Sequence, residues 1–176
     1  NIGNFYNAII NAMAYLERIF EMMDEKPTVN DVPNAKQLPI IQGMVEYKNV
    51  VFGYEEEGNI LNNIDFKVNP GETIALVGAT GSGKTTIVSL LSRFYDINSG
   101  KVEIDGIDIK TVKISSLRKQ MGIMLQDPFI FSGTIMDNIR YGRLDATDQE
   151  VLAAAKAVQA HPFISQLKDG YQTEVN

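Results

Sequence analysis

The sequence predicts an α/β fold from the order in which strand-like and helical patterns follow one another. Residues 73–77 are apolar and partly β-branched, which is typical of a buried strand. A glycine-rich segment comes next, and residues 86–95 then carry apolar side chains at helical spacing. Before this unit, residues 44–52 and 60–68 have the pattern of short strands. Along the sequence, a pair of strands is therefore expected first, followed by a third strand, a glycine loop and a helix.

Beyond the glycine loop the pattern predicts further strands and then mainly helices. The strands are expected at residues 101–104, 107–109 and 122–125. The helices are expected near residues 115–119, at 134–141 and 148–159, and from Pro162. Residues 171–176 are polar, and no further element is expected there.

The first 43 residues differ from the rest. Residues 1–26 predict one amphipathic helix, and residues 27–43, with three prolines, predict an extended linker. The helix has no cap and no initiating methionine, so we expect the sequence to be cut from a longer chain. Four asparagines in its first eleven positions make it too polar for a lipid-embedded centre. It fits the cytoplasmic end of a longer helix or, alternatively, an ordinary docking helix.

Composition excludes several classes of protein. The 176 residues are 44% hydrophobic and 22% charged, as in an ordinary folded domain. The net charge of −6 argues against a nucleic-acid-binding surface. The chain has no cysteine, so disulfides and thiol chemistry are excluded. No signal peptide and no apolar run of about 18 residues is visible in the sequence.

The glycine-rich segment GATGSGKT matches the phosphate-loop (Walker A) pattern GxxxxGK[ST] at every fixed position. Glycines let backbone N–H groups turn toward one anion, and the following helix start adds partial positive charge. Lys84 is expected to reach the β- and γ-phosphates, and the Thr85 hydroxyl to bind Mg²⁺. A glycine turn that merely precedes Lys-Thr is the alternative, but the flanking strand and helix argue against it. The candidate phosphate-binding residues are Gly78, Ala79, Thr80, Gly81, Ser82, Gly83, Lys84, Thr85 and Thr86.

With two further segments, the loop resembles the nucleotide-binding domain of an ATP-binding cassette (ABC) transporter of the exporter type. Tyr54, placed 24 residues before Gly78, looks like the aromatic residue on which the adenine ring stacks. Without the resemblance, a strand-end tyrosine packed on the core would be the simpler interpretation. The run from Met124 to Ile135, MLQDPFIFSGTI, resembles the Q-loop and its continuation. The resemblance implies that Gln126 helps to hold Mg²⁺ and the attacking water, whereas a lone Gln would be a turn residue.

The opening helix, with Glu17-Arg18-Ile19-Phe20-Glu21, is similar to the intracellular end of the last transmembrane helix of exporters. Other expected family features do not occur in the sequence. It has no LSGGQ-like signature and no apolar strand that ends in Asp-Glu, the Glu being the general base. The switch histidine is also missing, and His161 is interpreted as a capping or surface residue.

The resemblance implies a P-loop NTPase (RecA-like) core with an antiparallel β subdomain, truncated before the signature region is complete. It implies three parts: the cytoplasmic end of the last transmembrane-domain helix (1–26), a linker (27–43) and the N-terminal portion of the nucleotide-binding domain (44–176). It implies ATP and Mg²⁺ as cofactors, with catalytic roles for Lys84 and Gln126 and metal contacts for Thr85 and Gln126. The 176 residues alone are expected to be inactive.

The implied parent is a multi-pass cell-membrane exporter with this portion on the cytoplasmic side. Its partners are a second nucleotide-binding domain, identical or different, and the transporter's own transmembrane domain. Two alternatives remain open. One is a regulatory half with a degenerate site in a heterodimeric exporter, and the other is a soluble ABC-type ATPase of DNA repair or chromosome maintenance. A GTPase is disfavoured because no Asn-Lys-x-Asp motif occurs.

Overall fold

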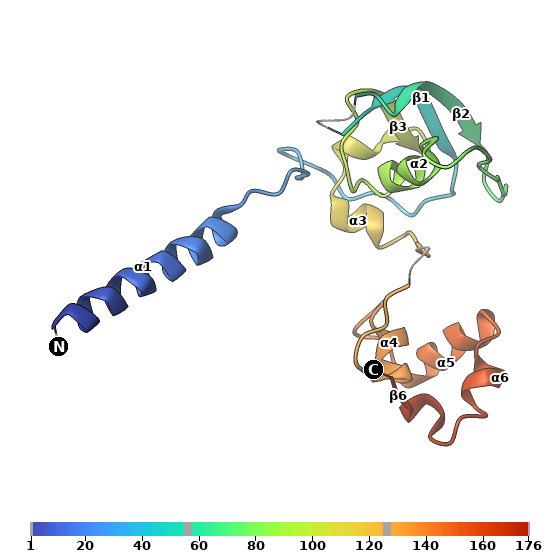
Figure 1. Cartoon of the computed structure of the whole chain (residues 1–176). Helices are drawn as coiled ribbons and strands as arrows, with labels where there is room; N and C mark the ends of the chain where they lie inside the picture. Colours follow the sequence, from blue (N-terminus) through green and yellow to red (C-terminus); the bar gives the residue numbers. More distant parts are fainter. Residues whose placement is uncertain (1, 55–57, 125–127, 176) are drawn as a thin grey trace. The chain divides into compact units, whose positions relative to one another are not determined.

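The computed structural model describes residues 2–54, 58–124 and 128–175 (Figure 1). They divide into two compact units, residues 1–122 and 123–176. The elements of the first unit are α1 (Ile2–Asp24), β1 (Val45–Phe52), β2 (Leu61–Val68), α2 (Lys84–Leu91), β3 (Ser99–Ile104), β4 (Ile107–Asp108), η1 (Ile109–Thr111) and α3 (Ile114–Arg118). Those of the second are β5 (Gly133–Thr134), α4 (Ile135–Arg140), α5 (Asp148–Ala157), α6 (His161–Ile164), η2 (Gly170–Gln172) and β6 (Glu174–Val175).

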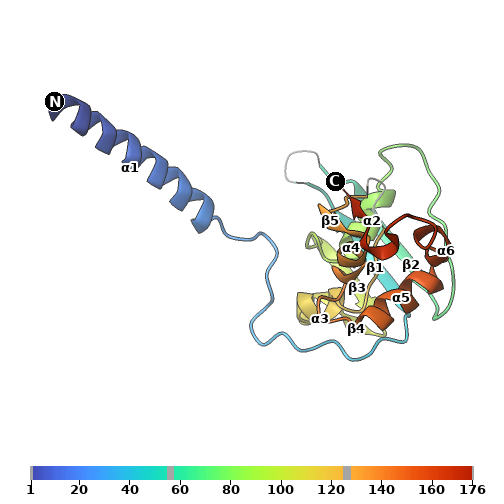
Figure 2. The same cartoon turned by 90° about the horizontal axis from the view of Figure 1, so that it is seen from below.

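Helix α1 runs without a break in both views (Figures 1 and 2). Its apolar stripe is solvent-exposed: Leu16, Phe20 and Met23 have 52%, 55% and 71% of their surface accessible. Within the described part of the chain, no helix combines the length and the apolar character needed to cross a lipid bilayer. The predicted amphipathic helix is therefore present, and its apolar side is unpaired within the described residues.

The sheet of the first unit is antiparallel, with strand order β2-β1-β3-β4. Strand β1 lies in the middle, and its Tyr47 is opposite Phe66 on β2 and Val102 on β3. The Tyr47 and Phe66 rings stack with centroids 4.5 Å apart. The predicted strands 44–52, 60–68, 101–104 and 107–109 are thus confirmed, and together they make the antiparallel subdomain.

Helix α2 packs on this sheet and closes the core. The β1 residues Tyr47, Val50 and Phe52 are buried, and Leu90 of α2 joins them. An irregularity in the pairing between Tyr47 and Val50 adds one residue to the two-residue period of the strand, so that burial resumes at Val50. The Tyr47 hydroxyl donates a hydrogen bond of 2.8 Å to the Ile87 carbonyl, which fastens the sheet to the helix. Burial raises the pKa of Tyr47, so this hydroxyl keeps its proton.

The predicted linker is bound to the unit along much of its length. Lys36 makes a parallel bridge with Val112, and the buried Leu38 donates its N–H to the Ser116 hydroxyl at 2.9 Å. The Gln120 side chain accepts the N–H of Ile41 at 3.0 Å and donates to the Pro39 carbonyl at 2.9 Å. The linker is therefore extended, as predicted, but it is not free.

The end of the linker is held by one carboxylate. Asp105 lies in the β3–β4 turn and accepts the N–H groups of Gln42, Gly43 and Met44 at 2.6, 3.2 and 2.9 Å. Partial burial works to raise the pKa of Asp105, but these three bonds outweigh it and hold the pKa below its ordinary value. This turn therefore sets where the linker enters β1.

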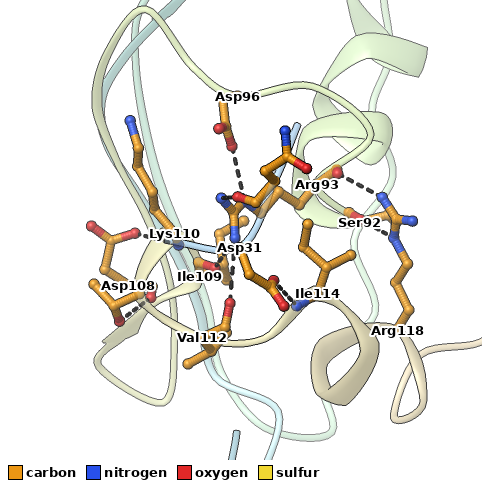
Figure 3. Close-up of polar contacts among 12 residues, drawn as sticks. Asp31, Ser92, Arg93, Asp96, Asp108, Ile109, Lys110, Val112, Ile114 and Arg118 are labelled. Atoms are coloured by element: carbon orange, nitrogen blue, oxygen red, sulfur yellow. Dashed lines mark hydrogen bonds and ion pairs between the residues drawn. The ribbon is translucent and has the colours of Figure 1, made fainter. Parts of the chain in front are cut away.

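A buried arginine holds the beginning of the linker (Figure 3). Arg93 is 1% exposed, and its guanidinium donates to the Asn30 carbonyl at 2.9 Å and to the Val112 carbonyl at 3.3 Å. Its Nε pairs with Asp96 at 2.8 Å. Asp31 then accepts the N–H of Ile114 at 2.8 Å, at the start of α3. Planar donors of this kind can satisfy several carbonyls at once, which suits arginine here.

Two predicted buried strands are not formed. Residues 73–77 are described in full and make no strand, and Val77 is 93% exposed. Residues 122–124 likewise make no strand, and Met124 is 95% exposed. A strand that is buried on both faces needs hydrogen-bonding neighbours, and no described strand pairs with either segment. Apolar composition alone is therefore not sufficient to form a strand.

The second unit is mainly helical, as predicted. Helices α4 and α5 each begin with a capping box, Thr134 with Asp137 and Thr147 with Glu150. The polar end of the chain contributes β6, which pairs with β5 in antiparallel register. The expectation that residues 171–176 add no element is wrong, because two residues there find a partner strand more than 30 positions earlier.

Candidate functional site

The phosphate loop and the start of α2 surround a pocket of about 300 Å³. The loop runs from Gly78, and the helix begins at Lys84. The first N–H groups of a helix have no partner within the helix, so they can bind an anion placed before it. The pocket is lined by Ile60, Gly81, Gly83, Lys84, Thr85 and Thr86.

Glycine is required at the residue before α2. Gly83 has φ of 85°, in the left-handed region, and its carbonyl accepts the N–H of Ile87 at 3.0 Å. A Cβ at this position would lie 2.6 Å from Leu61 Cδ2 and 3.2 Å from Ile60 Cγ2. Both the conformation and the close approach of β2 therefore exclude a side chain, and the loop backbone can face the pocket.

Lys84 folds its ammonium group into the loop. Its Nζ donates to the carbonyls of Gly78 and Ala79 at 3.0 and 2.8 Å. These acceptors are neutral, and a phosphate oxygen is a stronger acceptor for the same donor because it carries charge. The ammonium is thus held where a phosphate group entering the loop would meet it.

The two threonines after Lys84 differ in exposure. Thr85 is exposed on the pocket, whereas Thr86 is 7% exposed. A hydroxyl oxygen beside a phosphate site suits Mg²⁺, which is commonly held by one or two protein oxygens together with phosphates and water. Among the described residues no acidic or histidine cluster could hold a metal. The exposed Thr85 hydroxyl therefore has the chemistry that a Mg²⁺ site beside bound phosphates would use, and its metal role stays a prediction.

Tyr54 lies just beyond the end of β1 in a group of three aromatic rings. Its centroid is 5.0 Å from those of Phe52 and Tyr95, and both neighbouring rings are at 84° to it. The N–H of Gly53 donates to the Asn98 side chain at 2.9 Å, which fixes the backbone before Tyr54. Tyr54 is partly buried against the core, which agrees with the packing interpretation, and its stacking on adenine stays a prediction.

Ile60 contacts both the end of β1 near Tyr54 and the pocket at the phosphate loop. The sequence did not single it out as a site residue. Its N–H donates to the Phe52 carbonyl at 2.8 Å, and its side chain lines the pocket and contacts Gly83. It is the last residue before β2. The signal in the sequence was its place as the apolar first residue of the predicted strand 60–68.

Gln126 lies outside the described residues. Leu125 and Asp127 of the same run also lie outside the described residues, whereas residues 128–135 are described in the second unit. There the Asn138 side chain of α4 accepts the N–H of Phe131 and donates to its carbonyl, both at 2.8 Å. Phe131 also packs on Phe129 and Tyr141, with centroids 4.9 and 4.4 Å away. This part of the run is thus an ordered aromatic turn.

The His161 ring contacts two hydroxyl groups of its own unit. Its Nδ1 lies 2.9 Å from the Tyr171 hydroxyl and 3.3 Å from the Ser165 hydroxyl. These contacts join α6 to η2. The N-cap of α6 is Ala160 and, among the described residues, no side chain caps the helix, so the interpretation of His161 as a capping residue is wrong, whereas its partly exposed position agrees with a surface residue.

Comparison with known proteins identifies the relatives. The pattern of the family described as ABC transporter matches residues 61–175. An uncharacterized ABC transporter ATP-binding protein of Bacillus subtilis, YfiC, is 51% identical over 173 residues, which are 98% of this chain and 29% of that protein. The heavy metal tolerance protein of Schizosaccharomyces pombe is 44% identical over 98% of this chain and 21% of its own length.

A solved structure, a bacterial Atm1-family ABC exporter with ATP bound, superposes with a TM-score of 0.89 and 43% identity. It covers 97% of this chain, which in turn covers 30% of that protein. The chain therefore spans less than a third of these relatives. The predicted P-loop NTPase fold with an antiparallel β subdomain is confirmed. The chain belongs to the ABC transporter family.

Proposed function

We propose that this chain is the N-terminal part of the nucleotide-binding domain of an ABC exporter, in which ATP binding and hydrolysis drive export. The observation that carries the proposal is the pocket at the start of α2, with the Lys84 ammonium held inside the phosphate loop. In this proposal Gly78 to Thr86 bind the phosphates, and Tyr54 stacks on the adenine.

Thr85 would hold Mg²⁺, with Gln126 as a second contact, and Lys84 and Gln126 would assist the reaction. Bound Mg²⁺ would neutralise phosphate charge as the terminal phosphoryl group leaves. The part of this chemistry that belongs to the described residues is placement: the loop amides and Lys84 bring positive charge to one side of the nucleotide.

The same proposal divides the chain into the cytoplasmic end of the last transmembrane-domain helix (1–26), a linker (27–43) and the nucleotide-binding portion (44–176). The exposed apolar stripe of α1 supports the first assignment. The partners would be the transporter's transmembrane domain and a second nucleotide-binding domain, and the parent would lie in the cell membrane. Among the relatives, YgaD of Bacillus subtilis is named a putative multidrug export protein, and a Mycobacterium tuberculosis relative a fatty acid transporter.

The test is Lys84→Ala in the full-length parent. We expect Mg²⁺-dependent ATP turnover to fall about 100-fold or more, because a charge aimed at the reacting phosphates is removed. Lys101→Ala, an exposed lysine on β3, is the matched control and should turn over ATP like the wild type. Undiminished turnover in Lys84→Ala would place hydrolysis at a partner's site, as in the degenerate-half alternative.

A second measurement concerns the 176 residues alone. We expect no sustained turnover from them, because the sequence contains neither the signature nor the Asp-Glu strand that carries the general base. Steady Mg²⁺-dependent phosphate release by this chain would contradict that expectation.

A further inference from the structure

The phosphate loop precedes helix α2, and Tyr95 lies in the turn that follows the C-terminal end of the same helix. The turn begins at Arg93, whose φ of 52° is in the left-handed region. The Phe94 N–H donates to the Ser89 carbonyl at 3.0 Å. Arg118 braces it from α3, donating to the carbonyls of Ser92 and Arg93 at 3.0 and 2.7 Å (Figure 3). The chain just before Tyr95 is therefore fixed by side chains from another element.

The ring of Tyr95 packs on the residue that we propose to stack on adenine. Its centroid is 5.0 Å from that of Tyr54 at 84°, and 5.8 Å from that of Phe52 at 48°. Phe52 is itself 5.0 Å from Tyr54 at 84°. Perpendicular ring pairs of this kind are favourable, and two of them restrict the plane that the Tyr54 ring can adopt.

The segment that carries Tyr95 also fixes the backbone beside Tyr54. The Asn98 N–H donates to the Val51 carbonyl at 3.0 Å, and the Asn98 side chain accepts the N–H of Gly53 at 2.9 Å. Tyr95 thus contacts the Tyr54 ring, and Asn98 holds the backbone just before Tyr54. Phe94, next to Tyr95, does neither: its ring lies under the Arg118 guanidinium at 4.8 Å.

We propose that Tyr95 is a positioning residue for the base of the nucleotide, which it controls by setting the ring plane of Tyr54. A stacked purine lies parallel to its platform, so the plane of Tyr54 decides the plane of the base. Because α2 begins at the phosphate loop and ends one turn before Tyr95, a single helix links the phosphate side of the site to the base side. This inference rests on the proposed nucleotide-binding function.

The test measures the binding of two ligands to the full-length parent: ATP, and inorganic tripolyphosphate, which has no base. We expect Tyr95→Leu to weaken ATP binding about threefold to tenfold, the range of one aromatic pair, and to leave tripolyphosphate binding unchanged. Tyr95→Phe keeps the ring and should bind ATP like the wild type. Phe94→Leu, the neighbouring control, should also leave ATP binding unchanged.

The inference would be overturned if Tyr95→Leu binds ATP like the wild type, or if it weakens both ligands equally, which would indicate a merely structural role. In the double variant Tyr54→Ala with Tyr95→Leu, ATP affinity should equal that of Tyr54→Ala alone, and a further independent loss would also overturn it. Tyr54→Ala by itself separates the two proposals. If it leaves ATP binding unchanged, the proposed role of Tyr54 fails, whereas a loss there without a loss in Tyr95→Leu refutes only the role of Tyr95.

Discussion

Two segments of the first unit lack regular secondary structure, and they differ in the partners that they contact. Residues 27–43, the polar and proline-containing linker, are hydrogen-bonded to the unit at many positions. Residues 73–77, an apolar segment with a strand-like pattern, make no strand and expose Val77 almost completely. Whether a segment is fixed therefore depends on the partners it meets, more than on its own hydrophobicity.

The partners of the linker are side chains with donors or acceptors to spare. Asp105, Ser116, Gln120 and Arg93 each bind backbone groups of the linker, which removes the cost of unpaired polar groups near the core. As a strand, residues 73–77 would need neighbouring strands, and the described strands of the first unit all pair with one another in the sheet β2-β1-β3-β4. Substitutions of the residues that hold the linker, and of a residue within 73–77, test this difference.

The largest effect is expected for Arg93→Met. The guanidinium is buried and binds two segments at once, so its loss leaves several carbonyls and Asp96 without their donor. We expect the free energy of unfolding of the chain to fall by about 3 kcal/mol, measured by urea denaturation at pH 7. The exposed Lys101→Met is the control, with an expected change below about 0.5 kcal/mol. A loss of less than about 1 kcal/mol in Arg93→Met would mean that the linker is not held through this residue.

Asp105→Asn should have a smaller, pH-dependent effect. The neutral amide accepts the three N–H groups less strongly, and we expect a loss of about 1–2 kcal/mol at pH 7. Because folding lowers the pKa of Asp105, its contribution is present above the unfolded pKa of about 4 and is lost as the pH falls through the lower folded pKa.

The difference in unfolding free energy between wild type and Asp105→Asn should therefore shrink below about pH 4. Urea denaturation at several pH values between 7 and 3 measures it. Asp65→Asn is the matched comparison, since that carboxylate accepts one backbone N–H, from Asn49, and should matter less. A difference that stays constant with pH would contradict the role of the Asp105 charge.

The smallest effect is expected for Val77→Thr. The Val77 side chain is exposed to solvent, so the free energy of unfolding should change by less than about 0.5 kcal/mol. The same substitution at the fully buried Val50 places a hydroxyl in the core and should cost about 2 kcal/mol. If Val77→Thr costs more than about 1 kcal/mol, residues 73–77 are buried in a sheet and the contrast with the linker fails.

Local patterns were enough to predict much of the fold. The four strands of the antiparallel sheet and helices α3 to α6 follow from periodicity. Long-range pairing was missed: β6 pairs with a strand more than 30 residues away, and a polar dipeptide gives no sign of that. The strand expected at 73–77 and the described part, 122–124, of the strand expected at 122–125 are not formed for the same reason, since a strand is defined by its neighbours.

For the site, the phosphate-loop motif was informative because it specifies local backbone geometry. The left-handed φ at Gly83 and the fold-back of Lys84 involve residues close in sequence, so the motif could predict where they lie. The contribution of Ile60 and the packing of Tyr95 on Tyr54 join residues that are about 20 to 40 positions from their partners. No local pattern records such contacts.

The sequence by itself determined that this chain has a phosphate loop and a helix behind it, because glycine conformation and helix periodicity are local properties. Tertiary structure decided which segments are held in place. A proline-containing linker is fixed because Arg93 and Asp105 reach it across the unit, and an apolar segment stays open because no described strand lies beside it. Backbone hydrogen bonds must be satisfied by some partner, and only the folded chain shows which partners are within reach.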